Sequence, residues 1–277
     1  MSTTLPFKKM HGLGNDFAVF DARSMPLSLT ADQARLIGDR RWGIGCDQII
    51  VLEPSTQADV FMRIFNNDGS QAEACGNATR CVAALVNQET GKQGTMSIET
   101  LRGVLDVTSA DGGNTYRVNM GAPYLTPAGV PVNAAAIDQL DLDVEGYSTA
   151  TAVGMGNPHC VLFGPVVALD DTKLLALAAP LEVHKLFPNR ANVHFVEVLD
   201  RQRIRQRVFE RGAGITGASG SGACAGAVAS IYRGFTDNRV QVVLDSGVLE
   251  IEWAGGANDP VYMSGPWALA YEGEISI

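Results

Sequence analysis

The chain has 277 residues, of which 46% are hydrophobic and 18% are charged, and its formal net charge at pH 7 is −9. This balance is typical of a folded globular chain and excludes a disordered one, and the length suits one large domain or two of about 140 residues. No basic stripe accompanies the acidic net charge, so we expect no nucleic-acid partner.

The N-terminus and the cysteines indicate the compartment. The first residues, MSTTLPFKKMHG, lack the apolar core of a signal peptide, and no run of about 18 apolar residues predicts a membrane span. The chain has five scattered cysteines, an odd number that argues against a disulfide framework. We therefore expect a cytoplasmic protein with no membrane partner, in which any important cysteine acts as a thiolate.

Short strands dominate the first half of the chain. Apolar runs that end at Gly, Asn or Asp predict strands over Phe17–Asp21, Ile49–Glu53, Phe61–Phe65, Met96–Thr100 and Tyr116–Met120. Helical spacing predicts helices over Ala31–Asp39 and Ala78–Gln88, the second capped by Gly91. Thr108–Asn114 is typical of a hairpin turn, and the stretch from Asn119 to Pro131 predicts a linker.

The second half repeats this pattern. Strands are predicted over Cys160–Phe163, Val193–Val198, Arg205–Phe209, Val240–Leu244 and Val248–Trp253. Helices are predicted over Asp170–Ala179 and Ala223–Tyr232, with Gly234 near the end of the latter. Each half is therefore predicted to be α+β, with a layer of strands around one prominent helix.

Polar sequence features recur 142–144 residues apart, in the same order. The matched residues are Asn15 with Asn157, Gln48 with Asn192, Asn66 with Glu210, Asn67 with Arg211, and Cys75 with Ser219. Taken singly, each pair is also explained by the preference of Asn and Gly for turns. Taken together, matches at nearly one offset predict a duplicated unit. Two such units about a pseudo-twofold axis would place equivalent groups on opposite sides of one cleft.

Both prominent helices begin with small residues, Cys75-Gly-Asn in the first half and Ser219-Gly-Ser in the second. The first amides of a helix have no intrahelical partner, and with the helix dipole they form a site for a carboxylate or phosphate. A nucleotide phosphate is the competing ligand. The sequence has no GxxxxGK[ST], and Gly212–Gly217 fits GxGxxG without the βαβ context that such a site requires.

Cys75 is the cysteine best placed for chemistry. At a helix start the amide dipoles favour the thiolate, whereas a buried structural thiol is the alternative for any single cysteine. Cys81 and Cys224 lie within Ala-rich helical stretches, so we expect them to pack. The chain has no CxxC or HExxH, and its four histidines are dispersed, so we expect no metal site.

Six sequence segments together match the motif order of one known family. The segments KKMHGLGNDF, RRWGIGCDQ, MRIFNNDGSQAEACGNATRC, GNPH, ANVHF and ERGAGITGASGSGACA resemble the successive motifs of the diaminopimelate epimerase family, in order and across nearly the whole chain. The resemblance implies two pseudo-symmetric domains, each a barrel-like, mostly antiparallel sheet around a central helix. It places the active site in the cleft between them. The C-terminal strand would return to the first domain, giving residues 1–118 plus 264–277 and residues 119–263.

The resemblance also implies an activity. Members of the family are isomerases that interconvert LL- and meso-2,6-diaminopimelate on the route to lysine, without pyridoxal phosphate or another cofactor. Two cysteines flank the substrate α-carbon, and one removes the proton that the other replaces. The partner implied is this small-molecule substrate. A homodimer is compatible with the resemblance, and the sequence does not decide the oligomeric state.

The family's roles can be carried over position by position. The residues implied to act in proton transfer are Cys75, Ser219, His159 and Glu210. The residues implied to hold the distal amino-acid group are Asn66, Asn157, Asn192 and Arg211. The residues implied to meet the reacting carboxylate through backbone amides are Gly76, Asn77, Gly220 and Ser221, while Asn15 and Gln48 line the site.

One departure concerns the chemistry itself. Ser219 stands where the family has its second catalytic cysteine. A hydroxyl keeps the shape of the site, but it is a far weaker acid than a thiol, so we expect impaired turnover. Two alternatives remain open: a related one-cysteine racemase or dehydratase of another amino acid, and a non-catalytic amino-acid-binding protein.

Overall fold

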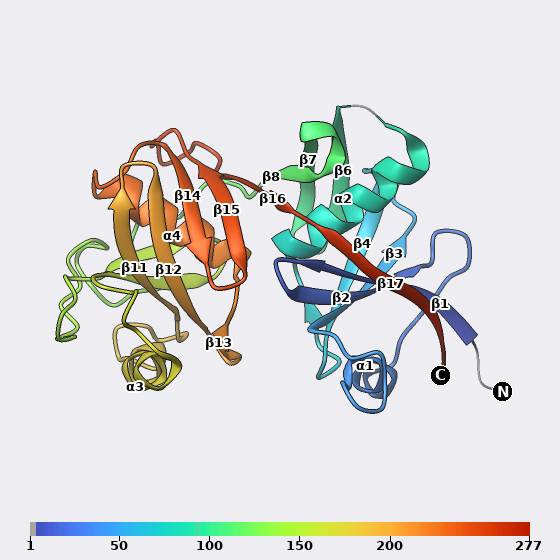
Figure 1. Ribbon diagram of the computed structural model, residues 1–277, viewed down its shortest axis with the longest axis horizontal. Helices are drawn as coiled ribbons and strands as arrows, with labels where there is room; N and C mark the ends of the chain where they lie inside the picture. Colours follow the sequence, from blue (N-terminus) through green and yellow to red (C-terminus); the bar gives the residue numbers. More distant parts are fainter. Residues whose placement is uncertain (1–3, 93) are drawn as a thin grey trace. The chain divides into compact units, whose positions relative to one another are not determined.

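The chain folds into two compact units, seen in a computed structural model that describes residues 4–92 and 94–277 (Figure 1). Unit 1 runs through Val118 and resumes at Gly265, and unit 2 is Asn119–Ser264. Each unit is a mostly antiparallel sheet with two α-helices, so the predicted α+β class is confirmed.

Unit 1 is one continuous ladder of strands. In ladder order the strands are β17 (Ala268–Ser276), β1 (Thr4–Gly12), β2 (Asn15–Asp21), β3 (Gln48–Glu53), β4 (Val60–Asn66), β6 (Thr95–Thr100), β7 (Gly103–Ala110) and β8 (Thr115–Asn119). The short β5 (Gln71–Ala72) pairs with the end of β4. The α-helices are α1 (Ala31–Gly38) and α2 (Gly76–Thr90), and a 3-10 turn at Asp111–Gly113 closes the β7–β8 hairpin, as predicted.

Unit 2 has the same ladder. Its strands in order are β9 (Thr151–Gly154), β10 (Pro158–Phe163), β11 (Asn192–Asp200), β12 (Arg203–Glu210), β14 (Arg239–Leu244), β15 (Gly247–Glu252) and β16 (Tyr262–Pro266). The short β13 (Gly214–Thr216) pairs with the end of β12. The α-helices are α3 (Asp171–Glu182) and α4 (Gly220–Tyr232).

The two ladders share their register as well as their order. Parallel β2 and β3 align Phe17 with Gln48, and parallel β10 and β11 align His159 with Asn192. The second parallel pair of each unit also aligns equivalent residues, Val60 with Ile98 in β4–β6 and Ile204 with Val242 in β12–β14. The predicted duplication is therefore confirmed at the level of backbone pairing.

One helix in each unit is almost wholly buried. Asn77–Val86 of α2 are all buried, as are Gly222–Ser230 of α4. Helix α4 contacts β9, β10, β11, β12, β14 and β15, which surround it (Figure 1). Small residues make this possible, because a Cβ added at Gly226 would lie 1.9 Å from Gln206 Oε1. The outer helices α1 and α3 cover a second apolar core in each unit.

The predicted linker at residues 119–131 was wrong. This segment belongs to unit 2, where Tyr124 bridges to Gly154 and Val130 is fully buried in the core. Its Gly and Pro content resembled a linker, but apolar residues between the turns anchor it. The strands β1, β7 and β17 were not predicted individually from their patterns. Each carries charged or exposed residues that weaken the apolar alternation.

Candidate active site

Cys75 is the N-cap residue of α2. Its backbone is extended, with φ −148° and ψ 109°, and its carbonyl accepts the first helical bond from Thr79 N. The amides of Gly76 and Asn77 therefore precede the helical ladder, as the anion-site hypothesis requires. The side chain of Cys75 makes no capping bond and is half-buried. Sequence reasoning placed Cys75 on the first helical residue, one position too far into the helix.

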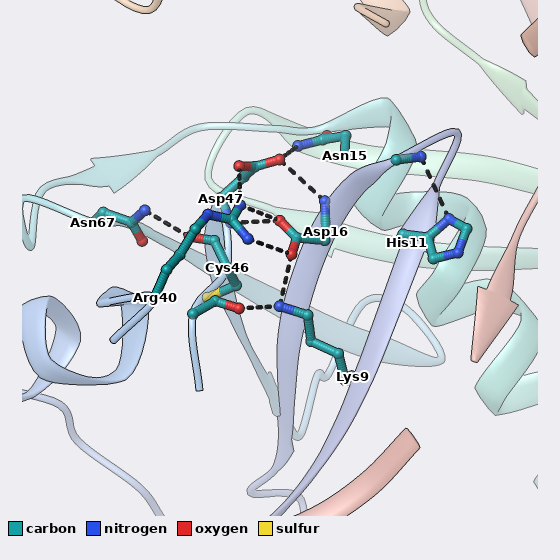
Figure 2. Close-up of polar contacts among 10 residues, drawn as sticks. Lys9, His11, Asn15, Asp16, Arg40, Cys46, Asp47 and Asn67 are labelled. Carbon is teal, nitrogen blue, oxygen red and sulfur yellow. Dashed lines mark hydrogen bonds and ion pairs between the residues drawn. The ribbon is translucent and has the colours of Figure 1, made fainter. Parts of the chain in front are cut away.

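Asn15 connects this helix start to β2. Its Oδ1 accepts a hydrogen bond from Asn77 Nδ2 at 3.0 Å and lies 3.9 Å from the Cys75 thiol sulfur, which donates to it. Its Nδ2 donates to Asp47 Oδ2 at 2.9 Å (Figure 2). Since Asp47 can only accept, it holds the Asn15 oxygen toward the helix start.

A cluster of charged side chains, formed by Lys9, Asp16, Arg40 and Asp47, lies next to Asn15 (Figure 2). Arg40 makes two bonds to Asp16, at 2.8 and 3.0 Å, and a third to Asp47 at 2.7 Å, while Lys9 lies 2.7 Å from Asp16. Burial opposes ionisation of Asp16, but the bonds from Arg40 and Lys9 outweigh it and lower its pKa to about 2. The Asp16 carboxylate therefore stays charged at neutral pH and fixes Arg40 beside Asp47.

Gln48 and Asn66 occupy the ends of neighbouring strands. Gln48 Nε2 donates to Asn66 Oδ1 at 2.9 Å, and Asn66 Nδ2 donates to Ser70 Oγ at 3.0 Å. Asn67 instead donates to the Cys46 carbonyl at 2.6 Å, on the side of α1. The unit 1 residues that the family pattern implies are therefore joined in two groups, one around Asn15 and one around Asn66.

Ser219 is the N-cap of α4, with φ −136° and ψ 121°, close to the backbone of Cys75. Its hydroxyl accepts from Gly222 N at 3.4 Å and donates to Glu210 Oε2 at 2.9 Å. Thr216 Oγ1 donates to the other oxygen of Glu210 at 2.7 Å. Glu210 thus sits directly beside Ser219, with both carboxylate oxygens hydrogen-bonded.

His159 and His194 form a buried pair in unit 2. His159 Nδ1 lies 2.8 Å from His194 Nε2, and His159 Nε2 lies 2.8 Å from Asn157 Oδ1. Burial first, and then the nearby His194 and Arg211, lower the pKa of His159 well below its usual value. Burial also lowers the pKa of His194 to about 3. Both imidazoles are therefore neutral near pH 7.

Asn192 is buried and bound at both ends of its amide. Its Nδ2 donates to the Pro158 carbonyl at 3.0 Å, and its Oδ1 accepts from Arg211 N at 3.0 Å. The Arg211 side chain is exposed and donates to the Asn189 carbonyl at 2.9 Å. Asn192 therefore fixes the backbone that carries Arg211, while the guanidinium itself faces solvent.

Metal and membrane chemistry find no support in the described part of the chain. Within residues 4–92 and 94–277, no cluster of His, Cys, Asp and Glu has the arrangement of a metal site. No helix there is long and apolar enough to cross a bilayer.

Comparison with known proteins decides the family. The chain matches the family described as diaminopimelate epimerase over residues 7–126 and 151–269. It is 48% identical to a diaminopimelate epimerase of Sphingopyxis alaskensis, over 97% of this chain and 96% of the relative. It is 49% identical to one of Rhodospirillum centenum, over 98% of this chain and 92% of that relative. The chain belongs to the diaminopimelate epimerase family. It is accordingly an epimerase, an enzyme of the isomerase class.

Solved structures of more distant proteins share the fold. A PhzF-family phenazine biosynthesis protein of Bacillus anthracis superposes with a TM-score of 0.71 at 15% identity, covering 99% of this chain and 100% of that chain. A hydroxyproline epimerase of Agrobacterium vitis superposes with a TM-score of 0.68 at 14% identity, covering 99% of this chain and 93% of that chain. At these identities the likeness shows the duplicated fold of the diaminopimelate epimerase family and nothing about substrate.

Several residues at the two helix starts escaped sequence reasoning. Asp47 and Arg40 were not singled out, although they lie in the RRWGIGCDQ motif. In unit 2, His194 and Gln206 were also missed. A charged residue directly before the predicted Gln48 was the available signal for Asp47, and no comparable signal marks Gln206.

Proposed function

We propose that this chain interconverts LL- and meso-2,6-diaminopimelate by proton transfer at the α-carbon, without a cofactor and with one proton-transfer group from each unit. The observation that carries the proposal is the matched pair of N-cap residues, Cys75 on α2 and Ser219 on α4, with nearly the same backbone angles. The substrate is inferred from the relatives, which are diaminopimelate epimerases.

The first half-reaction uses Cys75. Its thiolate takes the α-proton, so the Cα–H bond breaks, an S–H bond forms, and the electron pair stays on the substrate as a carbanion. Backbone amides at both helix starts, those of Gly76, Asn77, Gly220 and Ser221, would stabilise the adjoining carboxylate as negative charge develops.

The second half-reaction is where this chain departs from the family. The carbanion must receive a proton on its other face, and the side chain there is Ser219. Its O–H bond would break as the new Cα–H bond forms, and water would then return a proton to the oxygen, directly or by way of Glu210. The Ser219 hydroxyl donates to Glu210, so its proton is already engaged by a carboxylate. We therefore propose that Ser219 impairs this step.

The remaining polar residues implied by the family pattern would bind the distal end of the substrate. Arg211 suits a carboxylate because its planar guanidinium can make two parallel bonds. Asn157 would bind beside it, and Asn192 would act mainly by holding the Arg211 backbone. In unit 1, Asn66 and Gln48 would line the same substrate, and Asn15 would face the Cys75 sulfur. His159 would assist proton transfer from unit 2.

The test is a panel assay of this chain and of the Ser219→Cys variant with LL-diaminopimelate, meso-diaminopimelate and hydroxyproline, measuring both turnover and deuterium wash-in at the α-carbon. Loss of a positioned general acid typically lowers rates by about 10²–10⁴. Ser219→Cys should therefore epimerise diaminopimelate faster by about that factor, with little change in substrate affinity.

A matched control is Cys75→Ser, which should lose the wash-in that the parent chain retains for one stereoisomer. Equal turnover by the parent and Ser219→Cys would contradict an impaired second half-reaction. Activity on hydroxyproline but not on diaminopimelate would favour the one-cysteine racemase, and binding without any exchange would favour a non-catalytic binder.

A further inference from the structure

Unit 2 contains a buried chain of polar side chains in a part of the fold that is apolar in unit 1. Gln206 Nε2 lies 3.1 Å from His194 Nδ1, His194 Nε2 lies 2.8 Å from His159 Nδ1, and His159 Nε2 lies 2.8 Å from Asn157 Oδ1. The side chains of Gln206, His194 and His159 are fully buried. The chain thus joins the middle of β12 to the turn before β10.

The duplicated ladder identifies the counterparts of this chain. His159 aligns with Asn192 as Phe17 aligns with Gln48, so Phe17 is the counterpart of His159. By the same register, the counterparts of His194 and Gln206 are Ile50 and Met62, which are buried to the same degree. Unit 1 therefore builds the same strands around the same kind of helix with apolar side chains alone.

The helix beneath the chain differs in the same way. Gly222 and Gly226 lie one turn apart on α4, and a Cβ at these positions would lie 2.5 Å from His194 Cε1 and 1.9 Å from Gln206 Oε1. The equivalent residues of α2 are Ala78 and Val82. The glycines thus make room for the polar side chains, so unit 2 is adapted to them on two separate elements.

Each hydrogen bond of the chain has its donor on the Gln206 side and its acceptor on the Asn157 side. A backbone carbonyl determines this direction. Gln206 Nε2 also donates to the Gly222 carbonyl at 2.9 Å, which can only accept, so this atom is the amide nitrogen and its second hydrogen faces His194 Nδ1. His194 must then carry its proton on Nε2 and donate to His159 Nδ1. His159 in turn carries its proton on Nε2 and donates to Asn157 Oδ1.

We propose that Gln206 and His194 are positioning residues that lock His159 as the neutral Nε2–H tautomer and hold the Asn157 amide with its nitrogen outward. The kinetic part of this inference rests on the proposed function, whereas the tautomer itself does not. Protonating either imidazole on Nδ1 would set two donors against each other, which the bond pattern forbids. Because the chain ends at an amide, it fixes a tautomer and cannot pass a proton onward.

Two consequences follow for the reaction. In the locked tautomer both ring nitrogens of His159 are engaged, Nδ1 as an acceptor from His194 and Nε2 as a donor to Asn157, so the ring supports the site through Asn157 and is not a free base. The Asn157 oxygen is occupied, so its Nδ2 is the group left to meet a substrate, and a donor there selects a carboxylate over an ammonium group. Gln206 Oε1 is buried without a hydrogen-bond partner among the described residues, a cost that the two bonds of Gln206 Nε2 must offset.

Nitrogen NMR of the four histidines in the 15N-labelled full chain tests the lock directly. At pH 7 the long-range 1H–15N pattern of His159 and His194 should be that of the Nε2–H tautomer, and neither ring should titrate down to about pH 5. In Gln206→Met, which introduces the side-chain type of unit 1, His194 loses its donor, and both rings should lose the single tautomer. An Nδ1–H tautomer for either ring in the parent chain overturns the proposal.

Exchange kinetics test whether the fixed tautomer of His159 contributes to the reaction. Gln206→Met should lower α-proton exchange of diaminopimelate about 10- to 100-fold, the range for residues that orient a functional histidine. The fall should lie mainly in kcat if it acts through His159 and in KM if it acts through Asn157. The matched control is Thr236→Val, because the Thr236 hydroxyl is also buried in unit 2 without a partner among the described residues and lies off the chain. Thr236→Val should keep the parent rate.

A second variant covers the case in which Gln206→Met does not fold. His194→Ile combined with Gln206→Met introduces the unit 1 side chains at two of the three positions and should fold with the same loss of exchange. Parent-like exchange in either folded variant overturns a positioning role. Absence of exchange with diaminopimelate in every chain, including Ser219→Cys, overturns the proposed function instead, and the histidine spectra still decide the tautomer lock.

Discussion

The hydroxyl of Ser219 makes hydrogen bonds with two neighbours, and a thiol at this position would bond to both less well. It donates to Glu210 and accepts from Gly222 N, so it serves as a helix cap while its proton points at a carboxylate. Serine is among the best N-cap residues, worth about 1 kcal/mol over a residue that cannot cap. The serine thus favours the stability of α4, whereas the second half-reaction proposed above would need a stronger acid at this position.

Arg211 is the residue whose removal best tests how the substrate is held. Its guanidinium is exposed and bonded only to a backbone carbonyl in the described contacts, so Arg211→Ala leaves no buried charge behind. The expected loss is that of a charge-assisted hydrogen-bond pair, about 1.5–3 kcal/mol, or roughly 10- to 150-fold in affinity for diaminopimelate by calorimetry.

The matched control for Arg211 is Arg211→Lys. It keeps the charge but loses the planar fork, so it should recover only part of the affinity. An affinity unchanged in both variants would remove Arg211 from the substrate site.

At the candidate site, sequence alone singled out Asn15 and His159 but not the residues that orient them in the structure. Asn15 and His159 stand in motifs with a recognisable pattern. Asp47, which orients Asn15, and Gln206, which orients His194, are distant in sequence and meet their partners only through strand pairing. Such contacts depend on register, which hydrophobic patterning fixes for a strand but does not reveal for one polar pair.

At the scale of elements, the prediction succeeded where apolar residues are periodic. The four helices were predicted, with ends displaced by up to three residues, because small first-turn residues such as Gly76 and Gly220 lie outside the apolar repeat. Strands with exposed faces, such as β1 and β17, were missed because half their residues are polar or charged. The duplication compensated for this, since a match at one offset needs no secondary-structure assignment.

The position of a cysteine along its helix predicts its reactivity. Cys75 stands before the first turn of α2 and is half-buried, whereas Cys81 lies one and a half turns further in and is fully buried. Burial raises the pKa of Cys81 and of Cys160 to about 12, and that of Cys46 to about 11. Since the thiolate is the nucleophile, a small alkylating agent at pH 7.5 should label Cys75 first, as seen by peptide mass spectrometry.

Cys75→Ser supplies the control for this labelling. It should abolish the fast phase and leave the slow labelling of the buried thiols, which requires opening of the fold. Labelling of Cys81 or Cys224 as fast as Cys75 would contradict the assignment of Cys75 as the reactive thiol.

For the molecule as a whole, the buried histidine pair links folding to pH. Both rings have a folded-state pKa below the unfolded value of about 6.5, so the unfolded chain binds more protons as the pH falls. Their contribution is complete above about pH 6.5 and is lost as the pH falls toward the folded pKa, about 3 for His194. Carboxylates with lowered pKa, such as Asp16, add to the loss only below about pH 4.

The window between pH 6 and pH 4.5 therefore belongs mainly to the two histidines. Each should lower the free energy of unfolding by up to about 1.4 kcal/mol per pH unit, so urea denaturation should give a combined slope of up to about 2.7. The double variant His194→Ile with Gln206→Met removes one of the two rings and should roughly halve that slope, whereas Thr236→Val should keep it. An unchanged slope in the double variant would mean that the pair does not stay neutral in the folded protein, and the locked donor at His159 would fall with it.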